Sequence, residues 1–205
     1  MDAILDRAIG RASVVARWAA RCGGALLLAG AIIVSIDVIA RKLFAVSLGG
    51  ADELSGYAFA IGAAWSFAFV VLVRGNVRVD ALYVHLPAAL AAILDLVALL
   101  ALLAFASVVA WYGWDVMAGS FSRGARSNSS LAVPLWMPQV LWWLGYAMFA
   151  LTLLLLIARV GLALLLRDFA AVGRWAGARS TEEDAQSEIE RARAATGVAE
   201  VQGAR

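Results

Sequence analysis

The sequence predicts an all-α protein whose four long helices cross a membrane as one bundle. Four runs of the chain are almost entirely apolar, and each is close to or above the roughly 20 residues that span a hydrocarbon core of about 30 Å. In lipid the backbone of each run must satisfy its own hydrogen bonds, and none of the runs alternates like a barrel strand, so each should be a helix. Composition agrees, with 63% hydrophobic side chains and a mean hydropathy of +0.84 over 205 residues. The predicted spans are 23–44, 55–73, 88–114 and 139–166, within one membrane domain, 23–166.

Residues 1–22 precede these spans and form a basic amphipathic segment. Apolar side chains from Ile4 to Val15 recur at helical spacing, while Arg7 and Arg11 lie mainly elsewhere around the helix. Such a helix can lie on the inner membrane surface, or it can extend the first span. The residues alone leave both alternatives open.

Short polar segments connect the spans. After the first span, Gly49 and Gly50 predict a turn, and Asp52 and Glu53 lie where carboxylates favour the positive end of the second helix dipole. The segment 117–137 is the longest connection, and it is the one loop large enough to form a docking surface.

Beyond residue 166 the composition becomes polar. Ser180 and Glu183 form a capping-box pattern, followed by acidic and then basic residues, which predicts a short solvated helix. We therefore expect 167–205 to be a polar cytoplasmic tail.

The distribution of lysine and arginine predicts the orientation, because positive residues in short flanks stay on the cytoplasmic side. With the N-terminus inside, nine arginines flank the spans on the inner side against four basic residues outside, which places both termini in the cytoplasm. The inner set is Arg7, Arg11, Arg17, Arg21, Arg74, Arg78, Arg167, Arg174 and Arg179, and the outer set is Arg41, Lys42, Arg123 and Arg126.

The inventory of side chains argues against several classes of function. With one cysteine, Cys22, and one histidine, His85, the chain cannot build an internal disulfide, a thiolate metal cage or bis-histidine haem ligation. His85 precedes Pro87 in a loop, so an intramembrane enzyme with a facing nucleophile and base is not expected either. The positive charge lies at helix ends without interleaved aromatics. This pattern indicates the orientation in the membrane and not nucleic-acid binding. We expect no enzyme activity, cofactor or metal.

Few charged side chains fall within the predicted spans, where placing a charge at the helix centre costs roughly 2.5 to 3.5 kcal/mol. Asp37 and Arg41 are four residues apart and share one face of the first helix, so they should pair. Asp95 and Arg159 should lie at similar depth in antiparallel helices and could pair between them. A coupling-ion role for Asp37 is the alternative to simple neutralisation.

The spans lack the features of a transport site, since none is broken by mid-span Gly or Pro and few polar groups converge. Tryptophans instead gather near the outer ends of the last two spans, as an interfacial belt or a surface for a partner. Small residues that let another backbone approach predict a hetero-complex. The tryptophans are Trp111, Trp114, Trp136, Trp142 and Trp143, and the small residues are Gly24, Gly30, Gly56, Ala60, Gly62 and Ala63.

Three stretches of the chain form an ordered set of motifs. The first runs from Asp37 through Arg41 to Phe44 and on to an acidic pair; the second contains an Arg-Gly-Asn-Val-Arg-Val-Asp segment; the third leads from Ser129 into the last span. Together they resemble the small permease (DctQ-type) subunit of tripartite ATP-independent periplasmic (TRAP) transporters. The chain departs from the family where Asn76 replaces a usual histidine, and in its long tail. The matching positions are Arg41, Phe44, Glu53, Trp65, Arg74, Arg78, Asp80, Pro134, Trp136 and Gly145.

The resemblance implies a division of labour in a bacterial inner membrane. A soluble periplasmic protein captures an organic anion, a carboxylate or sugar acid, and a large DctM-type subunit moves it inward with a sodium gradient. The small subunit, surrounded by membrane lipid, supports the large one and helps to dock the binding protein. For that docking we expect Arg123 and Arg126 of the longest loop to contribute. The alternative is a self-contained proton- or ion-coupled transporter that uses Asp37.

Overall fold

The computed structural model describes residues 2–75, 86–177, 189–190 and 192–193. Within those ranges the chain is helical, and four helices are long and apolar enough to cross a membrane, as predicted. The helices are α1 (Asp2–Phe44), α2 (Ala51–Leu72), α4 (Ala88–Ser122), α5 (Trp136–Leu165) and α6 (Phe169–Ala176).

The first helix is continuous over its 43 residues. Of the two alternatives for residues 1–22, the structure therefore shows an extension of the first span. At about 1.5 Å per residue, α1 is about 64 Å long, roughly twice the thickness of the hydrocarbon core. Half of α1 thus extends past the length that a span needs.

Three other helix ends differ from the predicted ones by three to eight residues. The second helix starts at Ala51 instead of 55, which brings Asp52 and Glu53 into its first turn. Helix α4, predicted as 88–114, continues to Ser122, because Asp115 and the small residues after it do not stop a helix. Helix α5, predicted to start at 139, starts at Trp136, since Pro138 fits a first helical turn where no backbone N–H is needed.

The short helix α6 was not predicted, and it occupies the start of the segment 167–205. The Asp168 side chain caps it by accepting a hydrogen bond of 2.9 Å from the Ala171 backbone N–H. The helix buries Ala171, Val172 and Ala176 against the rest of the protein. The capping box predicted at Ser180 lies outside the described residues.

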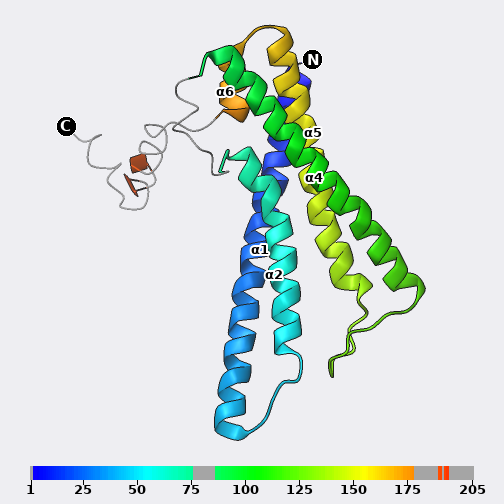
Figure 1. Ribbon diagram of the computed structural model, residues 1–205. Helices are drawn as coiled ribbons and strands as arrows, with labels where there is room; N and C mark the ends of the chain where they lie inside the picture. Colours follow the sequence, from blue (N-terminus) through cyan, green and yellow to red (C-terminus); the bar gives the residue numbers. More distant parts are fainter. Residues whose placement is uncertain (1, 76–85, 178–188, 191, 194–205) are drawn as a thin grey trace, which may run out of the picture.

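The four long helices form an open layer in the order α1, α2, α5, α4 (Figure 1). Each helix packs on its neighbour in this order, and α1 also reaches α5 near its own N-terminus, where α6 joins α4 and α5. The hairpin α1–α2 and the hairpin α4–α5 diverge toward the end that carries their connecting loops. We call this the loop end, and we call the opposite end, with the N-terminus and α6, the termini end.

Burial along the two edge helices repeats every seven residues. The inner helices bury two lines of side chains each, whereas α1 and α4 bury essentially one, and most of the buried residues on that line are small. A seven-residue period is typical of left-handed helix pairs. The repeating positions are Ile9, Ala16, Gly23, Gly30 and Asp37 in α1, and Ala92, Leu99, Ala106, Gly113 and Ser120 in α4.

Glycine allows the closest approach between helices. A Cβ added at Gly23 would lie 2.9 Å from the Gly62 carbonyl oxygen, so the backbones of α1 and α2 touch there. Gly30 similarly faces Ser55 and Ala58. Of the small residues expected to admit a partner, Gly30 and Gly62 therefore serve contacts within the chain, whereas a Cβ at Gly24 or Gly56 would meet nothing within 4 Å.

Candidate functional site

The carboxylate of Asp37 organises the turn after α1. Asp37 is 1% exposed, and it accepts hydrogen bonds from the Leu48 backbone N–H at 2.7 Å and the Ser47 hydroxyl at 3.2 Å. Arg41, one turn further on, forms an ion pair with the same carboxylate. The connection between α1 and α2 therefore folds back along α1 and is fastened to it. Phe44, at the end of the helix, is 73% exposed.

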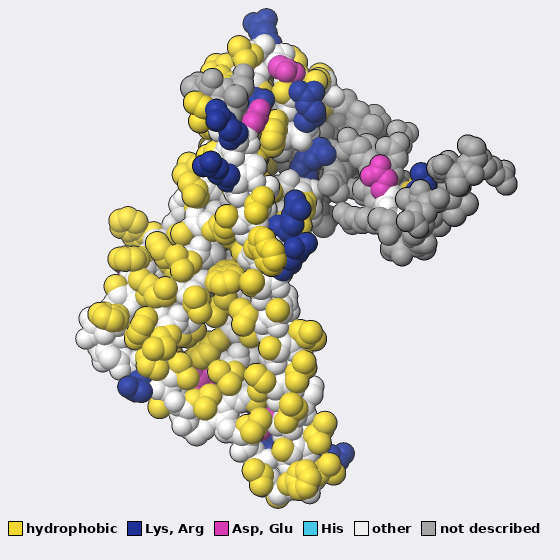
Figure 2. All heavy atoms as spheres, turned by 180° about the vertical axis from the view of Figure 1, so that it is seen from behind, with side chains coloured by type: hydrophobic (Ala, Val, Ile, Leu, Met, Phe, Trp, Pro, Cys, Tyr) yellow, Lys and Arg dark blue, Asp and Glu magenta, His cyan; other side chains and the backbone are white. Residues whose placement is uncertain are grey.

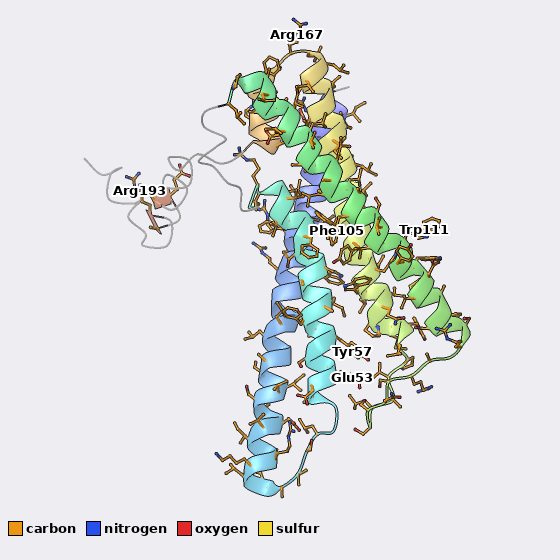
Figure 3. The ribbon with its side chains drawn as sticks, in the orientation of Figure 1. Glu53, Tyr57, Phe105, Trp111, Arg167 and Arg193 are labelled. Carbon is orange, nitrogen blue, oxygen red and sulfur yellow. The ribbon has the colours of Figure 1, made fainter. Side chains whose placement is uncertain are left out.

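Glu53, in the first turn of α2, lies against groups from two parts of the chain. The Tyr57 hydroxyl, one turn along α2, donates a hydrogen bond of 2.5 Å to the Glu53 carboxylate. The hydroxyls of Ser127 and Ser129, in the loop after α4, lie close to the same carboxylate. Figure 3 shows Glu53 and Tyr57 pointing from α2 toward this loop.

The same two serines shape the loop itself. The Ser127 hydroxyl oxygen accepts from the Val133 backbone N–H at 3.1 Å, and that of Ser129 accepts from the Leu131 N–H at 3.2 Å. Glu53 therefore lies beside a loop whose curvature depends on these two hydroxyls.

A further contact joins the two connecting loops directly. The Ser130 hydroxyl donates to the Gly49 carbonyl oxygen, and Leu131 packs so closely on Gly50 that a Cβ there would lie 2.3 Å from its side chain. Gly49, Gly50 and Ser130 border an open cleft of about 390 Å³, together with Asp37, Arg41 and Glu53. We call this group, with Ser127 and Ser129, the loop-end junction, and it ties one hairpin to the other.

The two arginines expected to dock a partner lie beside this junction and are both exposed. Arg126 donates from Nη1 to the Ala132 carbonyl at 3.0 Å, and its backbone pairs with Pro134. Arg123 ends α4, with its guanidinium over Gly119. The loop is thus folded into a defined shape, and Arg126 helps to hold that shape.

The α2–α5 contact depends on one tryptophan and one glycine. Trp65 donates from Nε1 to the Leu141 carbonyl at 2.8 Å, which satisfies its indole within the layer. A Cβ at Gly145 would lie 2.8 Å from both the carbonyl carbon and Cβ of Ala64 and from Cδ1 of Trp65. Only glycine lets the two helices lie this close.

The tryptophans near the loop end divide into two groups. Trp142 packs on Gly113 and on the Tyr146 ring at 4.8 Å, and Trp143 donates to the Ala110 carbonyl at 2.8 Å, so both hold α4 against α5. Trp136 packs edge-on against Phe121 at 5.8 Å. Trp111, by contrast, is 72% exposed and projects outward from α4 (Figure 3). The belt predicted from sequence is therefore partly internal packing.

At the termini end, Arg159 has a partner that the sequence did not suggest. It donates from Nε to Asp6 at 2.8 Å and lies over the Trp175 ring at 5.7 Å, which joins α5 to α1 and α6. Asp95 is 2% exposed and lines a cavity of about 320 Å³ beside Phe169. The predicted pair of Asp95 with Arg159 stays a prediction.

The Arg-Gly-Asn-Val-Arg-Val-Asp segment after α2 lies only partly within the described residues. Arg74 donates from Nη1 to the Gly173 carbonyl at 3.2 Å, so it links the end of α2 to α6. Asn76, Arg78, Asp80 and His85 lie outside the described residues.

Several contact residues could not be found from sequence. Tyr57 follows Glu53 by four residues, a spacing that predicts contact between two side chains on one helix. Ser127 and Ser129 lie more than 70 residues further along the chain, so no spacing predicts their approach to Glu53. Asp6 is one acidic residue among many arginines, with no local signal. Within the described ranges, no three His, Cys, Asp or Glu side chains gather as a metal site would require.

The fold and the loop-end junction define a helical membrane protein. Among the residues that the structure describes, the polar side chains mainly join helices and loops to each other. The family model for the DctQ component of tripartite ATP-independent periplasmic transporters matches residues 30–163. The chain belongs to this family and is a small membrane subunit of such a transporter, as its sequence motifs indicated. The family is one of transporter components, not of enzymes. No curated protein and no solved structure matches the chain.

Proposed function

We propose that this subunit supports a large DctM-type permease subunit that imports an organic anion, a carboxylate or sugar acid, with a sodium gradient. The observation that carries this proposal is the open layer. A single layer of helices leaves two broad faces uncovered, and most residues of the edge helices α1 and α4 are not buried within the chain. Lipid can cover such apolar surfaces. Because contacts at both the loop end and the termini end hold the layer together, it can also act as a rigid support for a larger membrane protein.

The distribution of charge supports an inner-membrane orientation with both termini in the cytoplasm. In Figure 2 the basic side chains gather over the upper half, toward the termini end, while the lower half is largely hydrophobic with a few basic residues at the loop end. This asymmetry follows the positive-inside rule. The loop-end junction then faces the periplasm, where the soluble binding protein arrives.

Asp37 favours this supporting role over that of a self-contained transporter. Its carboxylate is bound by Arg41, Ser47 and the Leu48 N–H, and this set of donors suits a residue that fastens a turn. A titrating carrier group would have to break these bonds in each cycle.

Copurification tests the proposal. We expect the tagged chain, expressed with its transporter operon and extracted in mild detergent, to bring a much larger membrane protein with it. In liposomes with an ion gradient, the chain alone should take up no organic anion, whereas the two membrane subunits with the binding protein should. Uptake by the chain alone would support the self-contained transporter instead.

Arg123 and Arg126 further support docking of the binding protein, because exposed arginines at the periplasmic end can steer an acidic surface. We expect reversal of both to glutamate to slow uptake by the complete system, most at limiting binding protein and at low salt. Lys42→Glu is the matched control, since Lys42 is also exposed at the loop end but on the other hairpin.

The amount of assembled membrane complex must be measured alongside, because Arg126 also bonds within its loop. Equal slowing by Lys42→Glu would point to a general charge effect. Loss of assembly would show that the arginines serve the loop and not the docking.

A further inference from the structure

A groove between α2 and α5 lies about one turn further into the layer than Glu53. Its walls are Tyr57, Ala60 and Ile61 of α2 with Pro138, Gln139 and Trp142 of α5, and its volume is about 190 Å³. An apolar cavity of about 150 Å³ can hold a molecule the size of benzene, so this groove has room for one large side chain.

One wall of this groove carries a polar atom without a partner. The Gln139 side-chain oxygen, Oε1, is buried and has no hydrogen-bond partner among the described residues. The nearby Tyr57 hydroxyl cannot donate to it, because that hydroxyl already donates to Glu53 at 2.5 Å. A buried acceptor without a donor is costly.

The chemistry of this oxygen separates the candidate occupants of the groove. A lipid acyl chain fits the apolar walls but has no donor, so it would leave the oxygen unsatisfied. A side chain with an N–H or O–H group satisfies both the walls and the oxygen. The last torsion of glutamine is soft, so a small rotation turns Oε1 toward such a group.

The position of the groove agrees with a protein occupant. It lies at the contact of α2 and α5, the two inner helices of the layer, so a subunit that covers this face meets the groove midway between the two edge helices. Well-packed pockets within an interface are where anchoring side chains bind, and tyrosine and tryptophan are common in them.

We propose that this groove receives a hydrogen-bonding side chain, an amide, a hydroxyl or an indole, from a membrane helix of the large permease subunit, with Gln139 as its acceptor. This inference rests on the proposed function, because it names the place where the two membrane subunits meet.

Photocrosslinking in the complete transporter tests the occupant. We expect benzoylphenylalanine at Ala60 to form an adduct with the large subunit. Phe59 is the matched control, since it lies at the same depth on α2 but is 66% exposed and does not line the groove. An Ala60 adduct with lipid alone, no adduct, or a yield no higher than at Phe59 would overturn the proposal.

Replacement of Gln139 tests the hydrogen bond. Gln139→Met keeps the length and bulk of the side chain but removes the acceptor, so we expect recovery of the large subunit in detergent to fall roughly threefold or more. Unchanged recovery would show that Gln139 binds no donor from the partner. Both measurements start from a preparation in which the unaltered chain copurifies with the large subunit, so failure of the groove is distinct from failure of the proposed function.

Discussion

Replacing Gly145 by alanine is expected to force α2 and α5 apart. The added methyl group would lie 2.8 Å from Ala64 and from Trp65, and part of that obstacle is backbone, which has no rotamer to change. Separation of the helices would also stretch the bond between the Trp65 indole and the Leu141 carbonyl. We expect a loss of about 2–3 kcal/mol in stability, at the upper end of overpacking effects, measured as a lower melting temperature of the purified chain.

Gly161 provides the matched control within the same helix. A Cβ there meets nothing within 4 Å, so Gly161→Ala should stabilise the chain by about 0.5–1 kcal/mol, through helix propensity alone. Equal effects of the two substitutions would mean that α2 and α5 do not meet at Gly145.

The second large effect is expected at Asp37. Alanine there removes the acceptor of the Leu48 N–H and the Ser47 hydroxyl and leaves Arg41 without its carboxylate, so the connection between α1 and α2 should detach from α1. We expect faster hydrogen exchange and proteolysis in residues 45–50, with a lower melting temperature.

Asparagine at Asp37 separates the two contributions. It keeps an oxygen for Leu48 and Ser47 but loses the ion pair with Arg41, so its effect should lie between those of the native aspartate and alanine. Asp52→Asn, an exposed change at the same end, should leave the loop protected. If the alanine variant protects residues 45–50 as well as the native chain does, the turn is held by other contacts.

The spans could be predicted because lipid leaves the backbone no choice but to form helices. Which helices pack against each other could not be predicted, since a helix that is apolar all round has no polar face to show which side is buried. Gly23 and Gly24 illustrate this limit: they are adjacent and chemically identical, yet one touches Gly62 and the other is open.

The polar contacts show the same limit in another form. The pair of Asp37 with Arg41 could be predicted because it follows helical spacing within one element. The approach of Glu53 to the loop after α4, and the ion pair of Arg159 with Asp6, join residues far apart in the chain. No local sequence pattern predicts such contacts, because they depend on how the two hairpins approach each other.

The unbroken length of α1 determines how this helix can move. Asp6 and Asp37 fasten it to other parts of the chain at two points that are about 47 Å apart along its axis. Between them, Gly23 and Gly30 are the places where the backbone of α2 fits against α1. Sliding α1 lengthwise by less than one repeat, about 10 Å, would bring bulkier residues against α2. The helix can therefore tilt as a rigid rod, but it is locked against axial slip.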